Sequence, residues 1–433
     1  MTPVEIGFLG IAFMLVLFFL GVHIGFALMI SGFLGFAMIC GWQSALSNIA
    51  LITFEKINSF NFAVVPFFLL MSSFVAGSGM GREMYNFGRS CFGQYKGGLA
   101  VATTAGVAVF SAISGSSLAC CVTFSKIAYP EMKRVGYDEK LALGTICAGA
   151  SMDVMIPPSN AFVIIGILAD LSIGQLFMAG VIPGIVQALC YAILILAWVT
   201  IYPKAAPPGP KTTLKQKLID TYRTWPVTVL FLLVMGGIYG GLFTAIEAGA
   251  IGAFFTFLIP LIRKQWTRKA IFASLLDAGK TSAMIIVMLV GAFIFNAFLA
   301  VTRVSFIASQ WIVNLPIPPI LILGMLLIVY IILGCFFDIY AVLILTIPIV
   351  YPTIEAMGYN LIWWSIVMTF ICEIGFITPP FGLNLFGMAG ALPEVNMTTV
   401  YRGVFPFIIA DLFILALLMA FPWLSLVLIT LMK

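Results

Sequence analysis

The chain has 433 residues, of which 62% are hydrophobic and only 9% are charged. Soluble globular proteins usually carry about 25% charged and about 45–50% apolar residues, so this balance excludes a soluble enzyme and a disordered tail. The net charge is +5, but the bases gather in short loops and form no stripe suited to phosphates, which excludes a nucleic-acid-binding protein.

Long apolar segments follow one another along the first half of the chain. Several reach the roughly 20 residues that a helix needs to cross a bilayer. The first of them lacks the basic stretch that precedes a cleaved signal peptide, so we expect it to remain in the protein as a helix. We expect helices over 4–20, 24–40 and 61–80, a hairpin over 97–129, an interrupted helix over 140–170 and a closing helix over 175–202.

The hairpin is the least ordinary of these elements. Its arms, about 98–113 and 117–128, are each too short to cross a bilayer comfortably, and the polar tip Ser114–Ser117 separates them. We therefore expect the hairpin to be re-entrant, entering and leaving the membrane on one face.

The second half of the chain resembles the first after a shift of 222 positions. Chance similarity between apolar segments does not place proline and glycine pairs so regularly. Without any gap, the shift lays Tyr129-Pro130 on Tyr351-Pro352, Gly136-Tyr137 on Gly358-Tyr359, and Pro157-Pro158 on Pro379-Pro380.

We therefore expect two repeats, each with about five membrane-spanning helices and one re-entrant hairpin. The first repeat covers 1–210 and the second covers 223–433, and a proline-rich linker over 203–225 joins them. The same shift places the second hairpin at 319–350 and the second broken helix at 361–392. Each half then crosses the membrane an odd number of times, which inverts the second repeat relative to the first.

The charges of the loops test this topology independently. Bases crowd the loops around the first hairpin, the linker and 262–280, and the positive-inside rule puts these loops in the cytoplasm. The expected outer loops, 41–60, 303–318 and 351–360, hold only two bases between them. We therefore expect the first hairpin to open to the cytoplasm, the second to open to the outside, and both termini to lie outside.

Each half contains two breaks, and the breaks fall at matching positions. Irregular backbone within a membrane is tolerated only where protein buries it or where it lines a watery cavity, and such pairs point to a transporter site. The prolines lack an amide donor and so leave carbonyl groups upstream without a partner. Together with hydroxyl, amide and carboxylate oxygens, these carbonyls suit a hard cation such as Na⁺. The N-termini of the half-helices suit an anion. The breaks are Ser114–Ser117 with Asp153–Asn160, and Gly334–Asp338 with Gly375–Asn384.

Asp153 and Asp338 are the most informative single residues, because a charge in the apolar core is costly and usually has a partner. Asp338 aligns with Ser116, so both hairpin tips carry an oxygen side chain at that position. Glu247 and Glu373 are also expected inside the membrane, where a structural and a functional role both stay open. Four further charged residues are expected near the membrane interfaces: Glu5, Asp170, Arg402 and Asp411.

Other interpretations stand beside the transporter. A single serine-rich tip or Pro-Pro pair is more often a kink or a small-residue helix contact, and paired breaks also suit a passive ion or anion channel. An intramembrane serine hydrolase using Ser116 would need His23 as its base, whereas a hydrogen bond at a helix end is the commoner role of such a histidine. The eight cysteines lie mostly in apolar runs without C-x-x-C spacing, and we interpret them as small buried hydrophobes.

Six stretches carry a family resemblance. They are GSSLA at 115–119, PEMKRVGY at 130–137, IPPS at 156–159, SIGQLF at 172–177, AGVIPG at 179–184 and TPPFGLNLF at 378–386. Each is a moderate signal alone, and together in this order they are strong. The chain resembles the large membrane subunit of tripartite ATP-independent periplasmic (TRAP) transporters over nearly its whole length.

The resemblance implies an all-α, elevator-type importer of the ion-transporter-superfamily kind, with one Na⁺ site for each hairpin and broken helix and several Na⁺ moved per substrate. In one departure, Asp153 stands where the family usually has glycine, and it could add an ion ligand or a proton-linked group. The implied first Na⁺ site uses Ser114, Gly115, Ser116, Ser117, Asp153 and Pro157; the second uses Gly334, Asp338, Gly375, Thr378 and Gly382; substrate would touch Ser159, Asn160 or Asn384.

The resemblance also implies partners and a location. A small four-helix membrane subunit and a soluble periplasmic protein that delivers an organic acid are expected as separate chains, in a bacterial inner membrane with both termini periplasmic. A sialic acid is the favoured substrate and a C4-dicarboxylate the next, although the delivering protein largely sets the specificity. We expect a transporter and no enzyme.

Overall fold

The computed structural model describes residues 1–431, and this part of the chain is helical throughout, without strands. Its apolar helices agree with the expected all-α membrane architecture. The first half forms α1 (Pro3–Phe19), α2 (Ile24–Cys40), α3 (Trp42–Ile57), η1 (Phe60–Ala63), α4 (Val64–Gly77), α5 (Met80–Phe92), α6 (Gly98–Ser114), α7 (Ser117–Val135), α8 (Glu139–Ser151), α9 (Asn160–Ala169) and α10 (Ile173–Ile201).

The second half has helices with closely corresponding bounds. The first hairpin has its tip between Ser114 and Ser117, and the second has its tip between Phe336 and Ile339, so both ends of the tips lie 222 residues apart. After the linker helix α11 (Leu214–Arg223), the helices are α12 (Trp225–Tyr239), α13 (Ala245–Ile262), α14 (Arg268–Thr302), α15 (Val304–Val313), α16 (Pro319–Phe336), α17 (Ile339–Ala356), α18 (Leu361–Ile377), α19 (Leu383–Ala391), α20 (Met397–Ala420) and α21 (Trp423–Thr430).

Among the described residues, seven helices are long and apolar enough to cross a membrane. Several others, including α1, α2, α6 and α18, are apolar but have only 10–17 residues. The hairpin arms α16 and α17 both belong to the longer class. The seven are η1 with α4 (Phe60–Gly77), α10, α13, α14, α16, α17 and α20.

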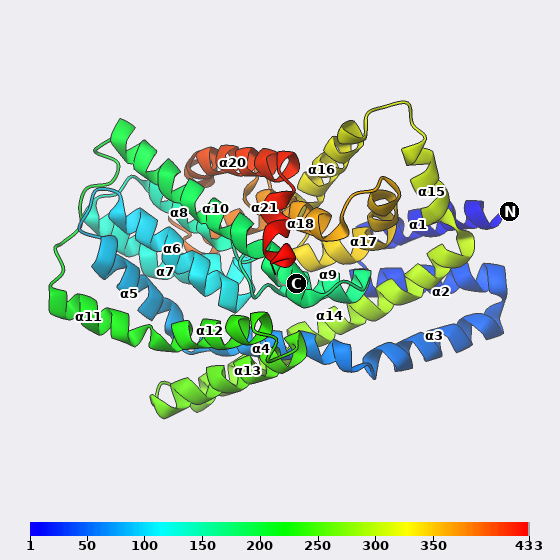
Figure 1. Ribbon diagram of the computed structural model, residues 1–433, viewed down its shortest axis with the longest axis horizontal. Coiled ribbons are helices and arrows are strands. Elements are labelled where there is room, and N and C mark those ends of the chain that lie inside the picture. Colours follow the sequence, from blue (N-terminus) through cyan, green and yellow to red (C-terminus); the bar gives the residue numbers. More distant parts are fainter. Residues whose placement is uncertain (432–433) are drawn as a thin grey trace.

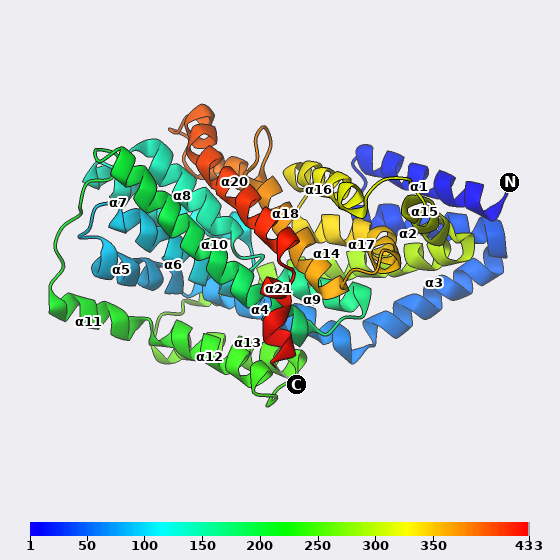
Figure 2. The ribbon, with the colours of Figure 1, turned by 45° about the horizontal axis from the view of Figure 1, so that its top comes forward.

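The two halves are interlocked. Helix α2 packs along α14 and α4 packs along α13, so each of these pairs joins one helix from each half. The second arm of each hairpin contacts the helix that follows the break of the other half, α7 on α19 and α17 on α9. Figures 1 and 2 show α6 and α7 on the side of the molecule away from the N-terminus, and α16, α17 and α9 nearer to it.

Three expected boundaries were wrong. Helix α3 fills most of the expected outer loop 41–60; its contacts with α2 and α14 stabilise a helix that hydropathy alone does not indicate. Helix α14 begins at Arg268, which leaves little of the expected loop 262–280. The second arm of the first hairpin continues to Val135 instead of 128, because a proline within it, Pro130, does not end the helix.

Ion pairs tie the base-rich ends of the helices together. Glu131 accepts from Arg89 at 3.2 Å and from Arg134 at 2.7 Å, which joins α5 to the open end of the first hairpin. Arg263, just after α13, binds Glu83 of α5 through both of its terminal nitrogens, at 2.9 and 2.7 Å. Such partly exposed pairs contribute little stability singly, but they fix α5 between the hairpin and the second half.

The linker follows the same surface. Its backbone pairs with the loops around the first hairpin, through Gly209 N to Gly93 O at 2.8 Å and Asp138 N to Ala205 O at 2.8 Å. Helix α11 then packs on α5, where Ser90 donates to the buried Asp220 at 2.6 Å. The linker is therefore held against the protein by these hydrogen bonds and by α11, although its proline-rich first part carries no helix.

Candidate ion and substrate site

The tip of the first hairpin lies against the break in the same half. Gly115 has a φ of +57°, a left-handed conformation that glycine adopts without strain, and it reverses the chain between α6 and α7. Ser116 then caps α7, because its Oγ accepts from Ala119 N at 3.3 Å. Ser117, the next residue, donates a hydrogen bond to the Oδ1 atom of the buried Asp153. Two residues of the expected first site therefore meet.

Side chains from three other elements surround Gly115. A Cβ atom at this position would collide with Nδ2 of Asn160 and would lie 3.1 Å from Oγ of Ser72 in α4. Tyr340, in the second hairpin, donates from its hydroxyl to Gly115 O at 3.1 Å. Asn160 was expected to touch substrate, and the structure places it at the tip of the first hairpin.

Other residues of the expected first site are used locally. Ser114 Oγ donates to Ser111 O at 3.4 Å within α6. Ser116 is exposed and serves as the cap of α7. Pro157 is buried in the break beside Pro158. The structure therefore brings only Ser117 and Asp153 of this set together by a direct hydrogen bond.

The second hairpin approaches its own break through backbone contact. A Cβ atom on Gly375 would lie 2.6 Å from the carbonyl carbon of Gly334, so only glycine lets α16 and α18 come this close. Asp338 caps α17, its Oδ1 accepting from Tyr340 N at 2.9 Å and Ala341 N at 3.1 Å. The carbonyl of Thr378 accepts from Cys335 Sγ at 3.7 Å. The structure thus brings Gly334 to Gly375 and Cys335 to Thr378, whereas the Asp338 carboxylate bonds the first amides of α17.

Gly382 and Thr378 delimit the second break. Thr378 is the C-cap of α18 and its hydroxyl donates to Ile374 O at 2.6 Å. Gly382, with a φ of +55°, precedes α19. Between them stands the Pro379-Pro380 pair, which corresponds to Pro157-Pro158 in the first half.

The three expected substrate residues carry buried polar atoms without a hydrogen-bond partner. These atoms are Ser159 Oγ, Asn160 Nδ2 and Asn384 Oδ1. A buried polar atom without a partner is costly, so a ligand that supplied a hydrogen bond would be favoured at any of them. Asn384 reaches across to the other half, where its Nδ2 donates to Cys147 O at 3.3 Å.

Two acidic residues have surroundings other than those expected. Asp411 was expected to be solvated near an interface, but it is fully buried inside the protein; both its oxygens accept from the Tyr191 hydroxyl at 2.8 Å. Its partner is 220 residues away, so no local pattern indicates the burial. Glu247 is exposed on the protein surface, and it forms a capping box with Thr244 at the start of α13.

The remaining polar expectations agree with the structure. Glu5, Asp170 and Arg402 are exposed. The Nδ1 atom of His23 accepts from Gly25 N at 3.4 Å at the start of α2, the helix-end role that was expected. Cysteines 120, 121, 147 and 372 are buried and free, but Cys40 is exposed and was expected to be buried.

Several residues near the site were not found from the sequence. Tyr340 reaches the opposite hairpin, and Ser72 comes from a helix that is distant from both breaks in sequence. Neither position stands out in its apolar segment. Gln187 does stand out, because it is a polar side chain in the middle of the 29-residue apolar helix α10, and its full burial could have been suspected on that ground.

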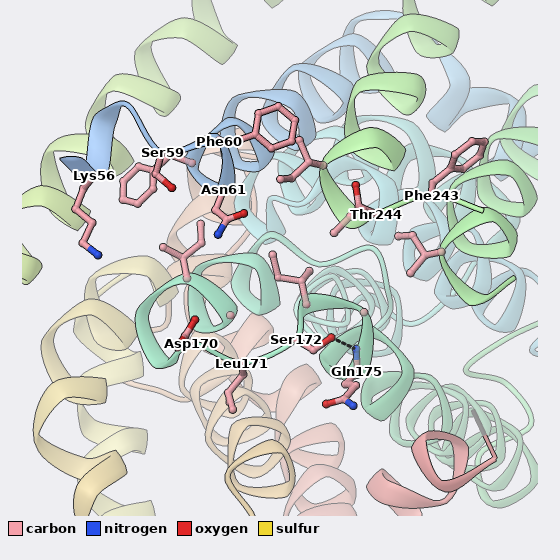
Figure 3. A pocket seen from close by; sticks show the side chains of 18 of the residues that line it. Lys56, Ser59, Phe60, Asn61, Asp170, Leu171, Ser172, Gln175, Phe243 and Thr244 are labelled. Atoms are coloured by element: carbon pink, nitrogen blue, oxygen red, sulfur yellow. Dashed lines mark hydrogen bonds between the residues drawn. The ribbon is translucent and has the colours of Figure 1, made fainter. Parts of the chain in front are cut away.

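A cavity of about 770 Å³ lies where elements of the two halves meet (Figure 3). Its wall combines the end of α3, the junction between α9 and α10, and the loop between α12 and α13. Lys56 is the basic residue labelled in the wall of this cavity, and its ammonium group lies 4.6 Å from the centre of the Phe293 ring. Asp170 and Thr244 line the same space (Figure 3).

The sequence as a whole matches a known family. Residues 11–424 correspond to the family described as tripartite ATP-independent periplasmic transporter, DctM component. The chain belongs to this family. A C4-dicarboxylate TRAP large permease, DctM of Pseudomonas aeruginosa, is 29% identical over 385 residues, which cover 89% of this chain and 90% of that protein.

Other TRAP relatives carry different substrates in their names. The sialic acid large permease SiaM of Vibrio cholerae is 26% identical over 414 residues, covering 95% of this chain and 96% of that protein. The isethionate permease DctMQ of Oleidesulfovibrio alaskensis is 31% identical over 370 residues, covering 84% of this chain but 57% of that longer protein. Family membership therefore leaves the substrate open.

Two solved structures share the fold. The YdaH transporter of Alcanivorax borkumensis aligns with a TM-score of 0.60 and 14% identity, covering 89% of this chain and 90% of its own. MtrF of Neisseria gonorrhoeae aligns with a TM-score of 0.57 and 13% identity, covering 97% and 95%. At these identities the likeness concerns the fold alone.

The chain is accordingly the large permease of a TRAP transporter, a multi-pass membrane protein that transports and is no enzyme. This confirms the family resemblance and the expected class of function. The family description makes it one component of a three-part assembly.

Proposed function

We propose that this TRAP permease subunit imports an organic anion across the bacterial inner membrane by Na⁺-coupled secondary transport. One observation carries the proposal: both hairpin tips lie against the breaks of their own halves and also touch each other. Ser117 bonds Asp153, Gly334 packs on Gly375, and the Tyr340 hydroxyl bridges the two tips at Gly115. Two oxygen-rich breaks are thereby held in one interior region.

The contact between the tips supports re-entrant hairpins. The arms α6 and α7 lie on the side of the molecule away from the N-terminus, and α16 and α17 lie nearer to it (Figure 1). If α16 and α17 each crossed the whole membrane, the second tip would reach a membrane face and could not meet the first in the interior. The ion-paired bases around α5 and α7 favour a cytoplasmic opening for the first hairpin. The second then opens to the periplasm, and both termini are periplasmic.

The two candidate ion sites offer mostly oxygen. Asp153 supplies a carboxylate to the first and Asp338 to the second, and serine, threonine and free carbonyl oxygens of the breaks complete each set. Hard cations such as Na⁺ bind such oxygen ligands, and here Na⁺ is transported together with the substrate. The first site comprises Ser114, Gly115, Ser116, Ser117, Asp153 and Pro157, and the second comprises Gly334, Asp338, Gly375, Thr378 and Gly382.

The substrate is an organic anion held between these sites. Helices α9 and α19 begin at Asn160 and Leu383, directly after the breaks, and a helix N-terminus presents N–H groups and a positive dipole end to an anion. Ser159, Asn160 and Asn384 add buried polar atoms that lack protein partners. A carboxylate or sulfonate is the chemistry common to the named substrates of the relatives.

The cavity of Figure 3 suits the entry of this anion. Its lining comes from segments expected on the periplasmic side, and Lys56 gives it a positive group. A periplasmic binding protein would deliver the substrate here. A small four-helix membrane subunit would support the permease in the bilayer while the hairpins and broken helices move as a unit in an elevator-type cycle.

The test is uptake into proteoliposomes that contain the permease, the small subunit and the binding protein encoded beside them. Radiolabelled sialic acid and a radiolabelled C4-dicarboxylate are the two probes, each with an inward Na⁺ gradient and with K⁺ in its place. We expect accumulation of one probe only with Na⁺. Equal uptake under both gradients would reject Na⁺ coupling and favour a passive channel.

A further inference from the structure

A group of polar side chains lies inside the protein apart from both hairpin tips. Glu373 of α18 and Asp411 of α20 are fully buried, and Gln187 of α10 stands between them. The Gln187 amide donates to Glu373 Oε1 and, at 3.4 Å, to Asp411 Oδ1. Ser151 donates to Glu373 Oε1 at 3.0 Å, and Tyr191 donates to Asp411. We call these five residues the central cluster.

The central cluster lies on the axis that relates the two repeats. Ser151 and Glu373 are 222 residues apart, so they are counterparts, and they are hydrogen-bonded to each other. When a residue touches its own counterpart, the axis relating the repeats must pass between them. Ser151 ends α8 just before the first break, and Glu373 precedes Gly375 in the second. The cluster therefore stands between the two candidate ion sites.

The central cluster has two acidic groups and no base. Within residues 1–431, neither Glu373 nor Asp411 takes part in an ion pair, and the side chains that bond them are an amide and two hydroxyls. Of the other titratable groups, Cys190 interacts electrostatically with Asp411, and Asp153, a further acid, interacts electrostatically with Glu373. Carboxylates in a membrane interior pair with a cation or line an ion path.

Two oxygen atoms of the central cluster also lack partners. Glu373 Oε2 and Gln187 Oε1 are buried without a hydrogen bond, although both belong to fully buried side chains that already bond each other through their other polar atoms. Acceptors buried in this way need a donor or a cation. The Gln187 oxygen is an observation separate from the two acids, and together with the absence of a base the unpartnered oxygens favour a cation as the ligand.

We propose that the central cluster binds Na⁺ as a third cation site, between the two hairpin sites. This inference rests on the proposed function and deepens it. An alkali cation suits a set of oxygen ligands, and the central cluster offers both carboxylates and the Ser151 hydroxyl. The Gln187 carbonyl joins this set once its amide group turns. A proton would join only two of these oxygens. A cation here would link α8, α10, α18 and α20 and so hold both breaks in position, which makes its binding cooperative with the hairpin sites.

The test counts Na⁺ bound to the full chain in lipid nanodiscs by equilibrium binding of ²²Na⁺. We expect Glu373→Gln and Asp411→Asn each to bind one Na⁺ fewer per chain than the wild type at saturation. Asp338→Asn, in the second hairpin site, should also lose one, and the double variant Glu373→Gln/Asp338→Asn should lose two. Glutamine and asparagine keep the shape of the acids, so we expect the variants to fold. Gel filtration and thermal unfolding identify a variant that does not, and in that case the remaining variant of the central cluster decides the test.

The outcomes separate the two proposals. If Glu373→Gln and Asp411→Asn bind as many Na⁺ as the wild type while Asp338→Asn binds one fewer, the third site is rejected and Na⁺ coupling stands; this includes the case in which the cluster holds a proton. If the wild type binds no Na⁺, the proposed function itself is rejected.

Discussion

At the scale of single residues, the buried carboxylates differ in the groups that donate hydrogen bonds to them. Asp338 is held by the backbone amides at the start of α17, whereas Asp153 is held by one serine hydroxyl. Glu373 and Asp411 share one amide. A carboxylate already bound by helix amides keeps oxygen lone pairs free for a cation without a change in the backbone, so Asp338 can be tested with the least structural disturbance.

Asp338→Asn separates ion binding from helix capping. Asparagine keeps an oxygen that can accept from the amides of Tyr340 and Ala341 but removes the charge. We expect the Na⁺ concentration for half-maximal uptake to rise roughly a hundredfold or more, a loss of about 2.8 kcal/mol, so that the site stays empty at concentrations that saturate the wild type, while the melting temperature changes little. Asp138→Asn is the matched control, because Asp138 caps α8 outside the site in the same manner. An unchanged Na⁺ dependence in Asp338→Asn would remove Asp338 from the site.

Lys56→Gln tests the cavity as the entry of the anion. A single charge near a protein surface contributes about 1 kcal/mol or more to the attraction of an oppositely charged ligand. We therefore expect the substrate concentration for half-maximal uptake to rise roughly fivefold, with a larger effect at low salt. Lys264→Gln, in the base-rich loop after α13, should leave uptake unchanged. Equal kinetics in wild type and Lys56→Gln would argue that substrate enters elsewhere.

At the scale of elements, the hairpins show what a sequence can reveal. The tips and breaks were predictable because proline, glycine and serine interrupt apolar runs, and because the shift of 222 residues repeats those interruptions. Helix α3 was not predictable from hydropathy, since it is polar along much of its length and is stabilised by α2 and α14. The burial of Asp411 depends on Tyr191 and Gln187, which only the folded chain brings close.

Gly375→Ala tests the approach of the second hairpin to its break. The added methyl group would lie 2.6 Å from the Gly334 carbonyl carbon, and backbone atoms on both sides leave no flexible side chain to yield. We expect a loss of about 1–3 kcal/mol in stability from overpacking, together with weaker protection by Na⁺ against thermal unfolding. Gly324→Ala, in α16 of the same hairpin, meets nothing within 4 Å and should be neutral or stabilising. Equal melting of both variants with Na⁺ would contradict this packing.

At the scale of the whole molecule, helices of each half pack on helices of the other half. Helices α2 and α4 of the first half pack on α14 and α13 of the second, and each hairpin packs on the other half's broken helix. Neither half therefore encloses a complete core by itself, although each hairpin tip meets the break of its own half. Because the central cluster lies between counterpart residues, a change of the ion there would act on both hairpin sites together. The orientation of the two hairpins then decides which side of the membrane each site can face.

Cysteine labelling at positions 133 and 355 tests that orientation. Lys133 and Glu355 are both exposed, and each lies near the end of the second arm of its hairpin. In a background with the exposed Cys40 replaced by serine, we expect a membrane-impermeant maleimide to label Glu355→Cys in cells with a permeable outer membrane. Lys133→Cys should be labelled only after the inner membrane is opened. The unsubstituted background measures labelling of the remaining cysteines. Labelling of both positions from the same side would reject the inverted repeat, and with it the opposite openings of the two hairpins.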